Sequence, residues 1–288
     1  MDAQTSPDNG RISGDMPPLE RIDGALDCGA LVICDHAANA LPPRYGDLGL
    51  PREALERHVG YDIGAAWVAR RLAERLGAPA VLSTFSRLLI DANRGDDDPT
   101  LVMRISDGVL TPGNARIDAE EIARRRRLYW APYRQAVATT VEAMLASGEP
   151  PAIISIHSFT PVWRGLPRPW KVGLLWDADP RLPQALIHAL AAEPDIGPAA
   201  VGDNEPYDGA LPGDTINAIA TARGLSSALI EIRQDLIAER AAAEAWGDRL
   251  ARVLTPILAP AQMRIAQDWG SRADGREAPA TLALSVQA

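Results

Sequence analysis

Two of the four histidines in this 288-residue chain stand at the ends of short apolar runs. Residues 30–34 lead into Asp35 and His36, and residues 152–156 lead into His157. Catalytic zinc takes protein ligands from His, Asp and Glu and keeps a fourth position for water. The two histidines therefore predict the imidazole ligands of a zinc site. The alternative is that each one only forms a hydrogen bond at the end of a strand.

The third ligand is less clearly marked by the sequence. Asp35 is adjacent to His36, but its side chain would point the opposite way on a continuing strand. Asn39 follows His36 by three positions and carries no charge. Asp62 stands at the predicted start of a helix, where it would also suit an N-cap. We take Asp62 as the third ligand, with Asn39 as the alternative.

Glu231 ends a third apolar run, residues 227–230. A carboxylate in such a position is costly unless it is paired or functional. As a general base, Glu231 would take a proton from the attacking water and return it to the leaving amine. The alternative is an ion pair with Arg233.

Arg87, Asp91, Asn93 and Arg94 lie together in the segment RLLIDANR. An arginine presents a planar fork of donors that matches a carboxylate. We therefore predict that Arg94 and Asn93 bind a substrate carboxylate and that Asp91 holds the arginine in place. An Asp–Arg pair that only fixes a loop is the alternative.

Other catalytic motifs are absent from the sequence. It contains no GxSxG, no GxxxxGK[ST], no HExxH and no GxGxxG after a strand. Ser158 is too close to His157 in sequence to form an obvious nucleophile–base pair. Cys34 is interpreted as a small buried core residue. His58 and His188 are interpreted as surface or capping residues.

Composition narrows the class of protein. The net charge of −9 argues against nucleic-acid binding. No run approaches the ~18 apolar residues of a membrane helix, and the N-terminus lacks the features of a signal peptide. Two cysteines do not make a disulfide framework in a chain of this size. We therefore expect a cytoplasmic protein with a small-molecule partner.

The elements that position these residues alternate between strands and helices. Strands are predicted at 30–34, 80–85, 88–92, 152–156, 172–176 and 227–232. Helices are predicted after Pro51 and at 62–76, 118–146, 181–192, 214–222 and 236–254. Residues 93–116 are too long for an ordinary connection and predict a lid or binding loop. Residues 199–213 form a second predicted loop, and Arg124–Arg127 a solvated helix face.

Continuous apolar strands alternating with helices are typical of a mostly parallel sheet covered on both faces. The chain therefore reads as one α/β domain over residues 25–262. Residues 1–24 are rich in Pro, Gly, Asp and Ser and are predicted to be a disordered leader or a surface strap. Residues 263–288 form the predicted C-terminal tail.

Six segments together resemble the N-formylglutamate amidohydrolase family. They are CDHAANALP, GYDIGA, SRLLIDANRG, SIHSFTP, NEPY and IEIRQDLI, and they cover roughly residues 30–240. That family is in turn similar to zinc carboxypeptidases and aspartoacylases. The resemblance implies a phosphorylase/hydrolase-like three-layer αβα sandwich with a mixed, mostly parallel sheet. This chain departs from the carboxypeptidase HxxE pattern, because Asn39 stands where Glu would be.

The resemblance implies zinc-dependent hydrolysis of an N-acyl amino acid, with N-formyl-L-glutamate as the reference substrate. One Zn²⁺ per chain, or another divalent metal, would be held by His36, Asp62 and His157. The remaining predicted site residues are Glu231 as base, Arg94 and Asn93 for the carboxylate, Arg87, Asn204, Tyr207 and Arg233 for the rest of the substrate, and Asp35, Asp91 and Ser158 in support. Alternatives are another N-acyl amino acid, a γ-glutamyl peptide, or a metal-free carboxylate-binding protein.

Overall fold

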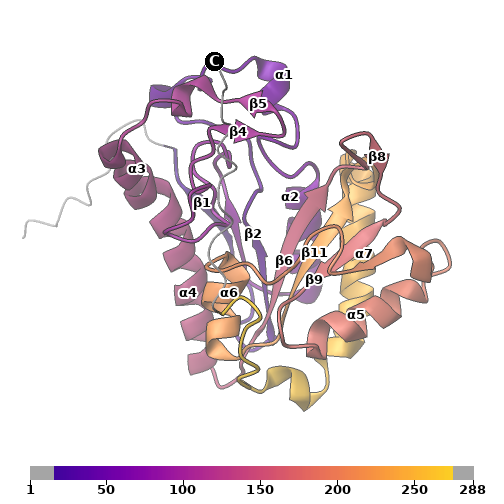
Figure 1. The fold of residues 1–288 in the computed structure, drawn as a ribbon. Coiled ribbons are helices and arrows are strands. Elements are labelled where there is room, and N and C mark those ends of the chain that lie inside the picture. Colours follow the sequence, from indigo (N-terminus) through magenta and orange to yellow (C-terminus); the bar gives the residue numbers. More distant parts are fainter. Residues whose placement is uncertain (1–15, 275–288) are drawn as a thin grey trace, which may run out of the picture.

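The computed structural model describes residues 16–274, and a mixed seven-stranded sheet forms its centre (Figure 1). The strand order is β1-β3-β2-β6-β11-β9-β10. The strands of this sheet are β1 (Leu19–Ile22), β2 (Ala30–Cys34), β3 (Ala80–Ser83), β6 (Ala152–Phe159), β9 (Val172–Leu175), β10 (Val201–Asp203) and β11 (Ser227–Arg233). Two small hairpins stand apart from it, β4 (Ile105–Ser106) with β5 (Val109–Leu110) and β7 (Val162–Trp163) with β8 (Leu166–Pro167).

Strands β3, β2, β6 and β11 run parallel to one another. The edge strand β1 is antiparallel to β3, β9 is antiparallel to β11, and β10 is parallel to β9. Every residue of β2 and of β6 is buried. Burial of both faces explains why these strands are continuous apolar runs rather than alternating ones. The prediction of a mixed, mostly parallel sheet is confirmed.

Helices cover both faces of the sheet and complete three layers (Figure 1). They are α1 (Arg52–Leu55), α2 (Ala65–Leu76), α3 (Ala119–Arg125), α4 (Ala131–Ala146), α5 (Arg181–Ala191), α6 (Thr215–Ile219) and α7 (Arg240–Leu258). One core cluster joins α2, α5 and α7 to the sheet, and a second joins α4 and α6 to its other face. Among the described residues, no helix combines the length and the apolar character needed to span a bilayer.

The N-terminal boundary differs from the prediction. Residues 19–22, assigned above to a leader, form β1 and pair with β3, with Leu19 opposite Ser83. The segment LERI alternates weakly at an edge position, so its sequence gives little strand signal. Residues 1–15 of the predicted leader and residues 275–288 of the predicted tail lie outside the described residues.

The predicted strand at 88–92 is wrong, although four of its residues are buried apolar side chains. Its backbone bonds to loops and side chains instead of a neighbouring strand. The N–H of Asp91 donates to the carbonyl of Leu101, and the side chain of Asn114 donates to the carbonyl of Leu88. An apolar run indicates that a segment is buried, but it does not indicate which groups its backbone bonds to.

The predicted helix at 118–146 is interrupted. A π-helical turn, Arg126–Trp130, separates α3 from α4. The prediction of a solvated Arg124–Arg127 face is wrong at Arg125, which is 2% exposed. Its guanidinium donates to the carbonyl of Leu89 and to the side-chain oxygen of Asn114. Arg125 therefore fixes the loop that follows β3.

Two further boundaries differ from the prediction. Strand β10 lies within the predicted loop at 199–213, and α7 begins at Arg240 rather than at residue 236. The cap predicted for α6 is confirmed, because the carboxylate of Asp214 accepts from the N–H of Asn217 at 2.7 Å.

Candidate active site

Three neighbouring parallel strands bring the predicted catalytic residues together. His36 follows β2, His157 lies in β6 and Glu231 lies in β11. Glu231 is the direct partner of His157 in the ladder between β11 and β6. Paired residues project to the same face of a sheet, so these two side chains share one side. The ladder thus sets their spacing.

His36, Asp62 and His157 form a buried cluster whose donor atoms lie within 4.8 Å of one another. Nδ1 of His157 is 2.8 Å from Oδ2 of Asp62, and Nδ1 of His36 is 3.5 Å from the same oxygen. Two imidazole nitrogens and one carboxylate oxygen are a donor set that suits zinc. Within the described residues, the buried Nδ1 of His36 has no hydrogen-bond partner, which fits an atom that ligates a metal.

The opposite ring nitrogen of each histidine meets a carboxylate. Nε2 of His36 is 2.6 Å from Oδ1 of Asp91, and Nε2 of His157 is 3.1 Å from Oδ2 of Asp35. Burial raises the pKa of both aspartates, but the hydrogen bond from His157 to Asp35 and the charge of Arg87 beside Asp91 outweigh it and lower both pKa values. An ionised carboxylate only accepts, so Nε2 carries the proton in each ring and Nδ1 is left for a metal.

Asp35 is the centre of a buried network and is 1% exposed. Besides His157, its oxygens accept from the hydroxyls of Ser155 at 3.0 Å, Tyr133 at 3.0 Å and Thr215. These donors come from β6, α4 and α6, respectively. The network connects the helical layer on this face to the orientation of His157, which agrees with a supporting place for Asp35.

His157 has an unusual charge state for a buried imidazole. Burial lowers its pKa, but hydrogen bonds with Asp35 and Asp62 outweigh this and raise the pKa well above its ordinary value. Burial also raises the pKa of Asp62, but the neighbouring imidazoles of His36 and His157 outweigh this effect and lower the pKa below its ordinary value. Without a metal, the raised pKa of His157 favours a proton on Nδ1 as well as on Nε2, between the two carboxylates. A metal that binds its Nδ1 must therefore displace a proton.

The structure distinguishes the two candidates for the third ligand. Asp62 lies in the cluster, whereas the amide of Asn39 donates to the carbonyl of Leu55 at 3.0 Å and is absent from the cluster. The predicted capping role of Asp62 is wrong, because Gly64 is the N-cap of α2 and no side chain caps that helix. Oδ2 of Asp62 accepts instead from the N–H of Ser158 at 3.2 Å.

Gly64 allows the chain to turn between Asp62 and α2. Its φ of +80° lies in the left-handed region that favours glycine. A Cβ there would lie 2.1 Å from the carbonyl oxygen of Ile237. Any larger residue would push α2 away from the segment before α7 and displace the Asp62 carboxylate.

Glu231 is 6% exposed, and its Oε2 has no hydrogen-bond partner among the described residues. Burial raises its pKa to about 7. The ion pair with Arg233, considered above, is not formed, because Arg233 pairs with Asp235 at 2.8 Å. A carboxyl with a pKa near neutrality can both accept and return a proton, as a general base must.

Arg87 and Arg94 supply positive charge beside the cluster. The Nη2 atom of Arg87 donates to Asp91 at 2.9 Å, and Nη1 lies 3.6 Å from Oδ1 of Asp62. Arg94 uses Nε for Thr100 and Nη1 for the carbonyl of Asn93. No hydrogen bond within residues 16–274 uses Nη2 of Arg94, which leaves that atom available to a carboxylate.

A cavity of about 560 Å³ lies over these groups. Its lining includes His36, Asp62, Arg87, Asn93, Arg94, His157, Ser158, Tyr207 and Glu231 from the predicted set. Asp35 and Asp91 do not line it and contact the histidines from behind. The volume is in the ordinary range for a small-molecule site.

Asn204 and Arg233 are not part of this cavity, contrary to the prediction. Oδ1 of Asn204 accepts from the backbone N–H groups of Trp176 and Gly209, at 2.9 and 3.0 Å. Arg233 donates to Asp235 and to the backbone carbonyls of Arg168 and Trp170, in the loop before β9. Both side chains stabilise loops, which sequence position alone does not distinguish from substrate binding.

Two residues near the cavity were missed. His58 lines it, with Nε2 3.1 Å from a carboxylate oxygen of Asp107, so its assignment to the surface is wrong. Its position four residues before Asp62 is the signal that could have placed it there. Arg168 is buried behind the wall, donates to the hydroxyl of Tyr207 at 3.1 Å and lies 5.2 Å from the ring of Trp163. Nothing in the local sequence marks it.

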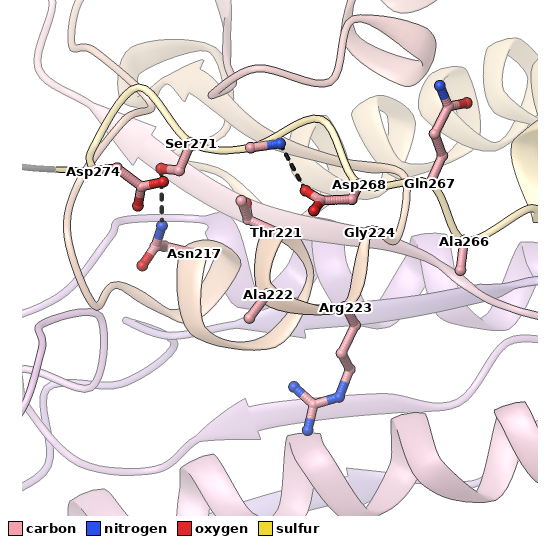
Figure 2. A pocket seen from close by; sticks show the side chains of 11 residues that line it. Asn217, Thr221, Ala222, Arg223, Gly224, Ala266, Gln267, Asp268, Ser271 and Asp274 are labelled. Atoms are coloured by element: carbon pink, nitrogen blue, oxygen red, sulfur yellow. Dashed lines mark hydrogen bonds between the residues drawn. The ribbon is translucent and has the colours of Figure 1, made fainter.

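A second cavity, of about 540 Å³, lies between the end of α6 and the C-terminal part of the described chain (Figure 2). The side chains of Gln267, Asp268 and Asp274 at its rim are exposed. The hydrogen bonds drawn there join lining residues to one another, from Gly270 to Asp268 and from Asn217 to Ser271. None of the His36, Asp62 and His157 cluster lines it, so the candidate active site is the first cavity.

A mixed sheet whose strand ends present two carboxylate-oriented histidines and a buried glutamate, beside an aspartate from the segment before α2, is the arrangement of a hydrolase able to hold a divalent metal. Comparison with known proteins agrees. Residues 28–238 match the family model described as N-formylglutamate amidohydrolase, and the chain belongs to that family.

Two solved structures are similar to this chain. Gene product Atu2144 from Agrobacterium tumefaciens is 31% identical, with a TM-score of 0.78 over 85% of this chain and 96% of that one. The N-formylglutamate amidohydrolase from Ralstonia eutropha is 23% identical, with a TM-score of 0.59 over 87% of this chain and 97% of that one. The second likeness shows the shared fold. The search of curated proteins gives no match.

Proposed function

We propose that this protein is a metal-dependent amidohydrolase that cleaves the amide bond of an N-acyl amino acid, with N-formyl-L-glutamate as the reference substrate. The metal is one Zn²⁺ per chain. One observation carries the proposal: His36 and His157 each direct Nδ1 toward Asp62 while a carboxylate holds Nε2. Membership of the N-formylglutamate amidohydrolase family supports the same reaction class.

The metal ligands and the general base have separate roles in hydrolysis. When bound by His36, Asp62 and His157, zinc would lower the pKa of a water molecule and polarise the amide carbonyl. Glu231, with a pKa of about 7, takes the proton of the attacking water and delivers it to the nitrogen of the leaving amine. Its unpartnered Oε2 is free to form these bonds.

Arg94 binds the α-carboxylate of the substrate, and Asn93 orients this carboxylate. The backbone N–H of Thr215 donates to Oδ1 of Asn93 at 3.0 Å, which fixes the amide group in one orientation. Arg87 remains paired with Asp91, which keeps the guanidinium in place. Arg87 therefore adds positive charge to the site without being free to move. These assignments require a carboxylate on the substrate.

The test measures zinc content and formate release from N-formyl-L-glutamate in the same preparation. About one zinc per chain together with hydrolysis supports the proposal. Zinc without formate retains the hydrolase and directs the assay to other N-acyl amino acids or γ-glutamyl peptides. No zinc, even after incubation with Zn²⁺, would refute the catalytic reading and favour a metal-free carboxylate-binding protein.

Two variants assign the roles. Glu231→Gln should keep zinc and lose turnover by 10²-fold or more, because the general base contributes roughly 10²–10⁴-fold. Glu120→Gln, an exposed change in α3, is the matched control and should behave as the wild type. His157→Ala should lose zinc. Activity retained by Glu231→Gln, or stoichiometric zinc retained by His157→Ala, would remove that residue from its role.

A further inference from the structure

We propose that the preferred substrate carries an apolar acyl group larger than formyl, so that the protein hydrolyses N-acyl amino acids with a medium-length aliphatic or aromatic acyl chain. This rests on the proposed function, because it names the substrate class of the same site. The acyl group would occupy the side of the cavity that neither the metal cluster nor the carboxylate-binding residues fill.

An apolar wall begins next to the general base. Leu229 precedes Glu231 by two positions on β11, so both side chains project to the same face. Leu175 on β9 is the ladder partner of Leu229, and both line the cavity. Phe159, two positions after His157 on β6, continues the wall on the same face.

The wall is fixed and extends toward the mouth of the cavity. Tyr207 and Trp163 also line the cavity, and the Arg168 guanidinium lies 4.9 Å from the first ring and 5.2 Å from the second. Arg168 also donates to the Tyr207 hydroxyl. A buried cation that bonds both aromatic residues holds them in place and presents their apolar surfaces to a ligand.

Two hairpins, β4–β5 and β7–β8, lie at the same end of the sheet (Figure 1). Trp163 of β7 and Ser106 of β4 contribute to the lining of the cavity. Both hairpins also expose apolar side chains, with Leu166 72% and Leu110 66% exposed. Neither leucine lines the cavity, so the hairpins contribute to it through Trp163 and Ser106.

The charged groups account for one carboxylate rather than two. Among the described residues that line the cavity, the guanidinium groups are Arg87 and Arg94, and Arg87 is already bonded to Asp91 and lies beside Asp62. The burial of His58 lowers its pKa, which disfavours an additional positive charge at that residue.

The positions of these groups give the substrate a direction. His36 follows β2 and His157 lies in β6, whereas Glu231, Leu229 and Leu175 belong to β11 and β9, on the other side of β6 from β2. The general base and the apolar wall therefore lie on the same side of the His36–Asp62–His157 cluster. With the substrate amide between that cluster and Glu231 and its carboxylate at Arg94, we assign the acyl group to the wall that begins beside Glu231.

The test is a series of N-acyl-L-glutamates with acetyl, butanoyl and hexanoyl groups, assayed by release of glutamate from the zinc-loaded protein. Acetyl is the reference, because formyl differs in intrinsic reactivity. Each methylene buried against the wall should raise kcat/KM about fourfold. A second series, N-acetyl-L-leucine against N-acetyl-L-glutamate, tests whether the apolar group belongs instead to the amino acid.

The outcomes separate the two proposals. Rising kcat/KM with acyl length supports the inference. A flat or falling series with measurable turnover overturns it and leaves the proposed hydrolase intact. A preference for the leucine substrate without an acyl-length effect also overturns it. No turnover of any substrate, N-formyl-L-glutamate included, by zinc-loaded protein overturns both proposals.

Substitutions locate the effect on the wall. Leu229→Gln changes the base of the wall, and Trp163→Ala changes its outer end. Each substitution should flatten the dependence of kcat/KM on acyl length. The dependence is a ratio within one variant, so loss of folded protein does not change it. An unaltered dependence in both variants would overturn the assignment of the acyl group to this wall.

Discussion

Asp35→Asn tests whether the carboxylate behind His157 controls the metal site. The two side chains have the same shape, but the amide offers one acceptor where the carboxylate offers two. Oδ1 of Asp35 accepts from Tyr133 and Thr215, and Oδ2 accepts from Ser155 and His157. In either orientation of the new asparagine side chain, its NH₂ group faces one of these two pairs of donors. That pair of buried donors then loses its acceptor.

The expected loss of zinc affinity follows from this change. Removing a carboxylate that orients a metal-ligating histidine typically weakens metal binding about 10- to 100-fold. This corresponds to about 1.4 to 2.7 kcal/mol. Unsatisfied buried donors also lower the free energy of unfolding by about 1–3 kcal/mol. The fold should tolerate that loss, so the metal affinity of the folded variant can be measured.

A second effect acts in the opposite direction. Hydrogen bonds with Asp35 and Asp62 raise the pKa of His157, so in the wild type a proton competes with the metal for Nδ1. Asp35→Asn removes one of these carboxylates, lowers that pKa and weakens the competition. As pH rises, zinc affinity increases until the competing proton on Nδ1 is lost. The wild type, with the higher His157 pKa, therefore continues to gain zinc affinity at pH values where the variant no longer does. The difference between the two proteins should widen as pH rises.

The assay is zinc competition with a chromogenic chelator at about pH 6.5, 7.5 and 8.5, with unfolding followed by circular dichroism. Asp27→Asn, at an exposed position, is the matched control. A folded Asp35→Asn protein that binds zinc with wild-type affinity at all three pH values would refute the argument that Asp35 orients His157.

Three further substitutions test other parts of the structure. Asn39→Ala should leave the zinc content of the purified protein unchanged, because Asn39 lies outside the metal cluster; loss of zinc would restore it as a ligand. Asp214→Asn should preserve the cap of α6 and remove a carboxyl whose pKa burial raises from 3.8 to about 7. The raised pKa means that the wild type loses stability as pH rises through this interval, so urea denaturation should show the variant gaining about 2–3 kcal/mol relative to the wild type between pH 5 and pH 8. An equal pH dependence in both proteins would contradict this. Arg125→Met should lower the free energy of unfolding by about 2–4 kcal/mol by leaving buried acceptors unpaired, and a change below ~0.5 kcal/mol would show that they find other partners.

The sequence predicted the parts of the site that depend on the central strands. His157 and Glu231 are placed by β6 and β11, and His36 follows β2. These strands are buried on both faces, so their apolar runs are continuous and their ends are easy to locate. Parallel neighbours then bring those ends to one edge of the sheet, which accounts for the agreement.

Long-range partners of polar side chains were not predictable in this way. Asn204 and Arg168 occupy similar loop segments, yet the first stabilises backbone and the second holds the wall of the cavity. The assignment depends on which distant residue each side chain reaches, and local spacing does not contain that information. The same limit applies to residues 88–92, where burial was predicted and the hydrogen-bond partners were not.

The π-helical turn between α3 and α4 has a consequence for insertions and deletions. Arg125 before it and Trp130 at its end both hold the loop after β3, the first through the carbonyl of Leu89 and the second through the carbonyl of Arg94. In a regular α-helix, residues five positions apart point about 140° apart, so the π-helical turn is what lets both side chains face this loop. Deleting one residue within 126–130 would leave an i, i+4 spacing in a regular helix, which also puts the two anchors on one face. The loss of one residue should therefore be tolerated here better than the gain of one.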